Sequence, residues 1–311
     1  MSVVRVQDLV KRYGSLLALD HFDLDIERGE VFGLLGPNGS GKTTAINCIL
    51  QLLSCDRGAV EVFGEQMTPA RYDLKGRIGV VPQNVAVFEE LTVRENIDYF
   101  CALYVKDKTR RRALVEKAIA FVGLEDYTKF RPRKLSGGLT RRLNIACGIA
   151  HKPELIFFDE PTVAVDPQSR NSILEGILRL NREGSTIVYT SHYMEEVEEI
   201  CSRIMIMDHG RAIASGTNNE LKAMIGTGEK IQVEVPDLPE AILDELRLQP
   251  QVRRASYDGK TLEVHCASGT HNLSDVLATL QKRRLVFGRV YSEPPTLNDV
   301  FLELTGAELR D

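Results

Sequence analysis

The sequence has no tryptophan, few cysteines and no long apolar run. Its six cysteines stand far apart without a Cys-x2-Cys pair, so the sequence indicates neither a zinc site nor a disulfide framework. No stretch approaches the roughly 18 apolar residues of a membrane-spanning helix, and the first residues do not read as a signal peptide. We therefore expect a cytoplasmic chain with reduced thiols that does not itself cross a membrane.

The sequence also lacks an excess of positive charge. Lysine and arginine number 39 against 44 acidic residues, so the net charge is −5. This balance disfavours a protein that binds nucleic acid through bulk positive charge, and we expect no nucleic-acid partner. Three basic runs (110–112, 131–134 and 282–284) are interpreted as solvated surface, with contact to anionic lipid as the alternative. The 311 residues suffice for about two ordinary globular domains.

Short β-branched runs alternate with helical patterns over residues 1–225. The strands expected there are 31–35, 78–81, 155–158, 186–190 and 204–207. This alternation predicts an α/β fold with a largely parallel sheet. Residues 84–150 interrupt the rhythm with helices, the first of which follows a capping box formed by Thr92 and Glu95. We interpret this stretch as a helical insertion into the α/β core.

The pattern changes after residue 225. Residues 226–229 are interpreted as a linker, and the elements expected beyond it are a strand at 231–235, a helix at 238–248, strands at 252–257 and 262–265, a helix at 272–282 and a strand at 286–291. This βαββαβ order predicts a small α+β domain of ferredoxin-like type at residues 229–311. A short closing helix is expected to be capped by the Thr296 hydroxyl.

The most informative motif follows the strand at 31–35. It reads Gly36-Pro37-Asn38-Gly39-Ser40-Gly41-Lys42-Thr43-Thr44, which fits a phosphate-binding loop, and a helix is expected after it. The glycines let backbone N–H groups converge on phosphates, Lys42 adds positive charge, and the Thr43 hydroxyl is available to Mg²⁺. The alternative, an incidental glycine-rich turn, does not account for the strand before the loop and the helix after it.

Two carboxylates follow the buried-type strand at 155–158. Asp159 and Glu160 should lie at the carboxyl edge of the parallel sheet, where the phosphates are expected. Asp159 is suited to hold Mg²⁺ directly or through water, and Glu160 to accept a proton from an attacking water. Such a pair alone would more often be a solvated loop, but together with the phosphate loop it favours metal-assisted hydrolysis.

A further motif carries a family resemblance. Leu135-Ser136-Gly137-Gly138, just upstream of the two carboxylates, resembles the signature motif of the ATP-binding subunits of ABC transporters. The chain is similar to that family over residues 1–225, which implies a P-loop ATPase core with ATP and Mg²⁺ as ligands. The resemblance extends to Tyr13 as the aromatic that stacks on adenine, Gln83 as the Q-loop glutamine, residues 161–166 as the D-loop and His192 as the switch histidine.

The same resemblance implies roles for these residues. Gln83 would meet Mg²⁺ or the attacking water and sense a membrane partner, and His192 would contact the γ-phosphate. Asp166, at the end of the D-loop, joins the nucleotide-binding set.

The resemblance also implies a dimer. Residues 136–138 open a helix and form a second anion site, and one phosphate cannot satisfy both sites of one chain. The family's solution is a head-to-tail dimer in which Lys42 of one subunit and Ser136 of the other enclose one ATP. Leu139, where Gln is usual, and residues 163–165 depart from the commonest family pattern without removing a catalytic atom.

The tail indicates which kind of ABC protein this is. Residues 293–306 resemble the C-terminal extension of bacterial multidrug exporters of the daunorubicin-resistance type. This implies an ATPase that powers export of a drug-like or lipophilic substrate through a separately encoded permease, which holds the chain at the inner face of the cell membrane. The permease's coupling helix is expected to dock after Gln83, around residues 88–90. The tail would strengthen dimerisation or regulate the cycle, with an inert appendage as the alternative.

Two other functions compete with export. A soluble ABC-type ATPase that acts on ribosomes or DNA is disfavoured because this chain has one cassette and only a short helical insertion. An importer ATPase is disfavoured because the tail shows mixed α/β patterning rather than that of a β-barrel.

Overall fold

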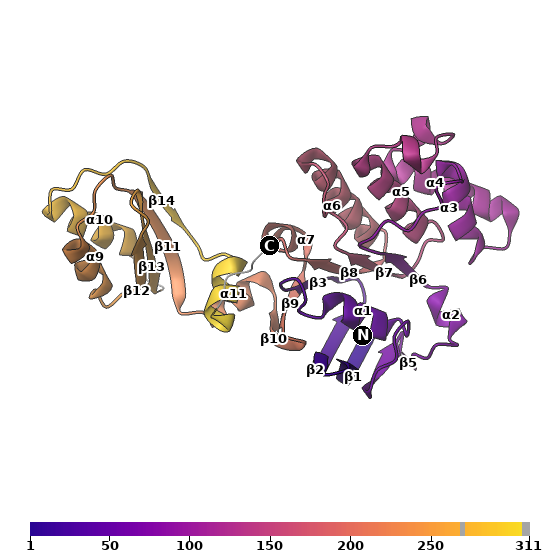
Figure 1. The fold of residues 1–311 in the computed structure, drawn as a ribbon, viewed down its shortest axis with the longest axis horizontal. Coiled ribbons are helices and arrows are strands. Elements are labelled where there is room, and N and C mark those ends of the chain that lie inside the picture. Colours follow the sequence, from indigo (N-terminus) through magenta and orange to yellow (C-terminus); the bar gives the residue numbers. More distant parts are fainter. Residues whose placement is uncertain (268–270, 307–311) are drawn as a thin grey trace. The chain divides into compact units, whose positions relative to one another are not determined.

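The computed structural model describes residues 1–267 and 271–306 (Figure 1). The chain divides into two compact units, with the boundary between Ser215 and Gly216. Within the two described ranges, no helix combines the length and apolar character needed to cross a bilayer.

The first unit contains two sheets and a set of helices. Its strands are β1 (Ser2–Tyr13), β2 (Leu16–Glu27), β3 (Val31–Leu35), β4 (Arg57–Val62), β5 (Glu65–Gln66), β6 (Ile78–Val81), β7 (Leu155–Asp159), β8 (Thr186–Ser191), β9 (Arg203–Asp208) and β10 (Arg211–Gly216), the last of which ends at the boundary. Its helices are α1 (Lys42–Ile49), α2 (Tyr72–Lys75), α3 (Val93–Ala102), α4 (Lys108–Val122), α5 (Gly137–Ile149), α6 (Pro167–Arg182) and α7 (Met194–Ile200), with 3-10 turns η1 (Glu125–Tyr127) and η2 (Pro132–Lys134).

The central sheet has the strand order β10-β9-β3-β8-β7-β6. Strands β9, β3, β8, β7 and β6 run parallel, which confirms the predicted α/β fold. These strands are mostly apolar, as expected for a parallel sheet with helices on its faces, and the residues of β3 are all buried. Since the carboxyl ends of parallel strands meet at one edge, the segments that follow β3, β6, β7 and β8 converge there.

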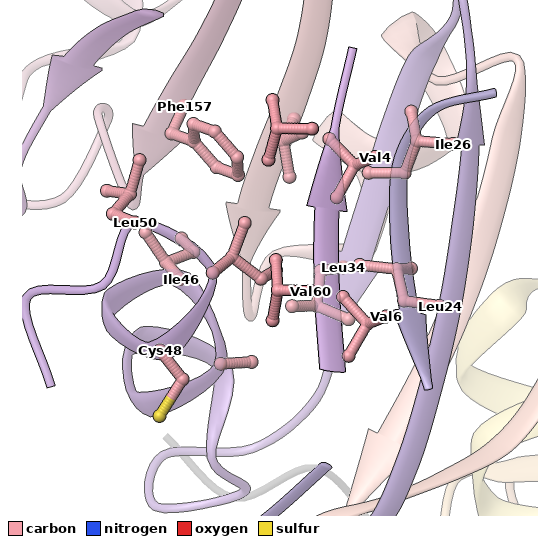
Figure 2. Packing of buried hydrophobic residues seen from close by; sticks show 14 of the residues in the cluster. Val4, Val6, Leu24, Ile26, Leu34, Ile46, Cys48, Leu50, Val60 and Phe157 are labelled. Carbon is pink, nitrogen blue, oxygen red and sulfur yellow. The ribbon is translucent and has the colours of Figure 1, made fainter. Parts of the chain in front are cut away.

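A second, antiparallel sheet was not anticipated from the sequence. Its order is β2-β1-β4-β5. The side chains of Phe22, Leu24 and Ile26 are buried at every second position of β2, so one face of this sheet packs inward. Figure 2 shows Leu24 of this sheet, Ile46 of α1 and Phe157 of β7 in one hydrophobic cluster. Helix α1, which begins at the phosphate loop, is therefore fixed by packing between the two sheets.

The helical insertion has a core of its own. Buried apolar residues of α3, α4 and α5 pack together, among them Ile97, Ile119 and Leu143. The predicted capping box is present: the Glu95 carboxylate accepts from Thr92 N at 2.7 Å, and the Thr92 hydroxyl accepts from Glu95 N at 3.3 Å.

The second unit has the predicted ferredoxin-like order. Its elements are α8 (Asn218–Met224), β11 (Thr227–Glu234), α9 (Glu240–Arg247), β12 (Val252–Tyr257), β13 (Thr261–Ala267), α10 (Asn272–Lys282), β14 (Val290–Glu293) and α11 (Leu297–Thr305). The sheet order is β12-β13-β11-β14 with antiparallel neighbours, as a βαββαβ unit requires. Thr296 caps α11, as expected.

Three expectations for this region need correction. Residues 226–229 are not a linker, because β11 begins at Thr227 and pairs with β13. Helix α8 belongs to the second unit, where it packs against α11, so this unit begins at Gly216 rather than at residue 229. The last strand covers 290–293 rather than 286–291, because Leu285 and Phe287 pack against the core without entering the sheet.

Candidate functional site

The phosphate loop joins β3 to the N-terminus of α1. Gly36 is closely enclosed: a Cβ atom there would lie 2.2 Å from the Met207 carbonyl oxygen, so only glycine fits. Gly41 is the N-cap of α1 with φ +106°, a conformation that favours glycine, and no side chain caps the helix. The N–H groups of the first turn of α1 are thus left for an anion.

Lys42 lies within this loop with its ammonium group buried. Its Nζ donates to the carbonyl oxygens of Gly36 at 2.7 Å and Pro37 at 3.1 Å, and lies 3.4 Å from Glu160 Oε1. Burial lowers the pKa of Lys42, and the Glu160 carboxylate opposes that shift. The Ser40 hydroxyl oxygen beside it is buried without a hydrogen-bond partner among the described residues. A buried cation and an unsatisfied hydroxyl in one loop fit an anionic ligand.

Asp159 at the end of β7 is held by two hydroxyl groups. Thr43 Oγ1 donates to Asp159 Oδ2 at 2.9 Å, and Thr190 Oγ1 donates to Asp159 Oδ1 at 2.7 Å. A carboxylate beside a threonine hydroxyl at a phosphate loop is an oxygen donor set that suits Mg²⁺. In the described part of the chain, no group of three or more His, Cys, Asp or Glu side chains could hold a metal.

Glu160 occupies the centre of the site. Its φ of +46° is unusual for a non-glycine residue. The conformation is held by its N–H group, which donates to the Thr190 carbonyl at 3.2 Å and to the Thr190 hydroxyl at 3.0 Å. Its Oε2 atom accepts from Gln83 Nε2 at 3.1 Å and lies 3.2 Å from His192 Nδ1. The structure thus brings Lys42, Gln83 and His192 together around one carboxylate.

Sequence reasoning missed three residues that support this cluster. Thr190 joins Asp159 to the backbone of the next residue, as described above. Arg141 Nη1 donates to the Gln83 carbonyl at 2.6 Å, and Asn144 Nδ2 donates to the Pro82 carbonyl at 3.2 Å. Burial lowers the pKa of Arg141. The available signal was a charged and an amide side chain on the buried, otherwise apolar face of α5.

The signature residues form a separate group. Ser136 caps α5 by accepting from Leu139 N at 3.3 Å, and Asp166 caps α6 by accepting from Ser169 N at 2.9 Å. Hydrogen bonds from Ser169 lower the pKa of Asp166. A Cβ atom on Gly138 would lie 2.8 Å from Ser169 Oγ, so the two helix starts are close neighbours. Within the described ranges, these residues share no hydrogen bond or ion pair with the phosphate loop.

Tyr13 ends β1 with an exposed ring, 46% accessible. The Lys11 ammonium lies 5.4 Å from the centre of that ring. Stacking on a base requires an accessible ring, and the exposed ring of Tyr13 meets this requirement.

The sequence matches two known families. The ABC transporter family matches residues 19–163, and the C-terminal domain of DrrA1-3-like ATP-binding proteins matches residues 216–305. The second match begins at the residue where the structure places the start of the second unit.

Three relatives are similar over nearly the whole chain. The linearmycin resistance ATP-binding protein LnrL of Bacillus subtilis is 36% identical, covering 99% of this chain and 100% of the relative. The daunorubicin resistance ATP-binding protein DrrA3 of Streptomyces coeruleorubidus is 35% identical, covering 99% and 98%. The Nod factor export ATP-binding protein I of Paraburkholderia xenovorans is 36% identical, covering 100% and 99%.

Solved structures agree with this assignment. A dimeric ATP-binding cassette in a post-hydrolysis state, bound to ADP and Pi, is 26% identical with a TM-score of 0.64, covering 69% of this chain and 98% of that one. The cbiO1 subunit of a Clostridium perfringens ABC transporter complex is 26% identical with a TM-score of 0.66, covering 71% and 91%. The chain therefore belongs to the ATP-binding proteins of ABC transporters and is an ABC-type ATPase with a DrrA-like C-terminal domain.

Proposed function

We propose that this ATPase powers the export of a drug-like or lipophilic substrate through a separately encoded membrane permease. The observation that carries the proposal is the full-length similarity, second unit included, to proteins named for linearmycin resistance, daunorubicin resistance and Nod factor export. In this proposal the first unit hydrolyses ATP and the second is an accessory domain of the exporter type.

The proposed chemistry uses the cluster around Glu160. Its carboxylate accepts the proton of the attacking water, while Gln83 and His192, both in contact with it, orient the carboxylate. Lys42 leaves its loop carbonyls to bind the phosphates, and His192 contacts the γ-phosphate. Thr43 and Asp159 would hold Mg²⁺, which when bound neutralises phosphate charge. Gln83 is a further candidate ligand of Mg²⁺, through its carboxamide oxygen.

The proposed active unit is a head-to-tail homodimer. The start of α5, with Ser136, Gly137 and Gly138, presents N–H groups that form a second anion site. One phosphate cannot bind both this site and the phosphate loop of the same chain. In the proposed dimer they bind the nucleotide held by Lys42 of a second copy, and Tyr13 stacks on its adenine. Asp166, which caps α6 beside Gly138, is proposed to face the second copy. A dimeric relative of this fold has been solved with ADP and Pi bound.

The proposed permease dock lies on the helical insertion. Phe88, Tyr99 and Phe100 form an aromatic cluster with ring centres 4.9 Å to 5.9 Å apart. Phe88 and Tyr99 remain 42% and 45% exposed. Exposed clustered aromatics are typical of binding sites for a partner helix. Docking there would place the chain at the cytoplasmic face of the membrane, held by the permease.

Affinity purification of the tagged chain from mild-detergent extracts of its native cells tests the proposal. We expect a multi-spanning protein to co-purify in stoichiometric amounts, and Phe88→Ala to reduce its recovery. Tyr72→Ala is the matched control, because Tyr72 is a 77% exposed aromatic outside the cluster. Recovery of ribosomal or DNA-associated proteins without a membrane protein would contradict the exporter assignment.

A further inference from the structure

A buried carboxylate behind the proposed site belongs to none of the predicted site residues. Glu196 on α7 is only 2% exposed. Three hydroxyl groups donate to its Oε2 atom: those of Thr162 at 2.9 Å, Tyr189 at 2.7 Å and Ser191 at 3.0 Å. The Arg170 Nε atom lies 3.1 Å from its other oxygen. One side chain thus gathers partners from the D-loop, β8 and α6.

Two of these partners flank the proposed catalytic residues. Thr162 stands two residues after Glu160, at the start of the D-loop, and Ser191 immediately precedes His192. The Ser191 hydroxyl also accepts from Tyr193 N at 2.9 Å, so it bonds to the backbone beyond the histidine. One carboxylate oxygen of Glu196 therefore connects the segment that contains Glu160, the proposed base, with the loop that contains His192, the proposed γ-phosphate contact.

The arrangement is specific for a carboxylate. Burying an ionised side chain is costly unless charge and hydrogen bonds compensate, and here three hydroxyls and one guanidinium do so. Burial raises the pKa of Tyr189 far above its usual value, so its phenol remains a donor. A carboxamide in the same place would turn an NH₂ group toward Arg170 or toward the hydroxyls.

We propose that Glu196 is a positioning residue for ATP hydrolysis. Its carboxylate fixes the His192 loop against the segment that follows Glu160 and so maintains the 3.2 Å contact between His192 Nδ1 and Glu160 Oε2. Arg170 extends the link to α6, whose cap is Asp166 of the D-loop. The inference rests on the roles proposed above for Glu160 and His192.

Steady-state ATP hydrolysis by the full chain carrying Glu196→Gln tests this role. We expect kcat to fall about 10- to 100-fold, the scale for displaced reacting groups. KM for ATP should change little, because Glu196 makes no hydrogen bond or ion pair with the phosphate loop in the described part of the chain. Glu199→Gln, the same substitution at an exposed position of α7, is the control and should behave as wild type. An unchanged kcat in a folded Glu196→Gln protein would overturn the proposal.

A double-mutant cycle keeps the proposal testable if Glu196→Gln does not fold. Thr162→Val and Ser191→Ala each remove one donor, and if Glu196 couples them their effects on kcat are not additive. Additive effects, or lowered thermal stability with unchanged kcat, would overturn the proposal.

Glu160→Gln distinguishes this inference from the proposed function. Wild-type hydrolysis by that variant removes the proposed site and the inference with it. An inactive Glu160→Gln together with an additive cycle removes only the role of Glu196.

Discussion

Replacing Arg141 by methionine tests whether α5 holds Gln83 in place. Arg141 donates to the carbonyl oxygen of Gln83 at 2.6 Å, and its contacts to the carbonyls of Pro82 and Val163 are long, at 3.4 Å each. A hydrogen bond from a charged group contributes about 1.5–3 kcal/mol, and the long contacts add little. Burial lowers the pKa of Arg141, so part of this gain is offset by the cost of burying the charge.

The net expectation is a loss of about 2 kcal/mol in the free energy of unfolding of the first unit. For a unit of this size, this corresponds to a Tm about 4–8 °C lower. Because the Gln83 side chain contacts Glu160, kcat for ATP hydrolysis should fall as well, by about tenfold. Calorimetry and an ATPase assay measure the two effects.

Arg112→Met is the control, since Arg112 is an exposed residue of α4. It should change stability by less than about 0.5 kcal/mol. An unchanged Tm and kcat in Arg141→Met would refute the reasoning, because they would show that the buried guanidinium neither stabilises the first unit nor holds Gln83 in place.

Three further predictions concern other parts of the chain. Gly36→Ala should weaken ATP binding about tenfold or more, since a Cβ atom 2.2 Å from a backbone oxygen forces the loop to shift; a titration with a fluorescent ATP analogue that shows wild-type affinity would argue against it. Asp159→Asn should raise the Mg²⁺ concentration for half-maximal hydrolysis about 10- to 100-fold, and an unchanged Mg²⁺ dependence would exclude Asp159 as a ligand. Burial would raise the pKa of Glu263, but hydrogen bonds from His265 and Gln232 and the Lys230 ammonium lower it from 4.5 to about 2. The second unit should therefore be stabilised by ionised Glu263 above pH 4.5 and lose that stability as the pH falls toward 2; urea unfolding should separate Glu263→Gln from wild type at neutral pH and not near pH 2, and equal stability at neutral pH would contradict this.

The parts of the fold that could be predicted are those with a local signal. Strands β3, β6 and β12 and helix α10 have the predicted bounds, because each is a short apolar or amphipathic run between turn residues. The antiparallel sheet was not predicted, although Phe22, Leu24 and Ile26 alternate with aspartates, the period-2 pattern of a half-buried strand. The glycines at 226 and 228 suggested a linker, but pairing of β11 with β13 decides the structure there.

The candidate site shows the same division. Lys42, Asp159 and Glu160 could be proposed because each stands in a motif next to a strand end. Arg141 and Glu196 could not be proposed in this way. Arg141 contacts backbone carbonyl groups that lie 22 to 59 residues away in the sequence, and Glu196 contacts Thr162 of the D-loop, 34 residues away. A polar side chain on the buried face of α5 marks such a position, but its partners are set by the packing of α5 and α7 against the sheet, which no local pattern encodes.

Glu160 is the residue on which the proposed ATP-driven cycle depends most directly, as the base of hydrolysis. The decisive measurement is the rate of ATP hydrolysis by Glu160→Gln, together with its ATP affinity and its sedimentation with ATP, beside Glu183→Gln as an exposed control. We predict hydrolysis about 10²–10⁴-fold slower, with ATP binding retained and a persistent ATP-bound dimer. Turnover by Glu160→Gln at the wild-type rate would contradict the role of Glu160 as the base.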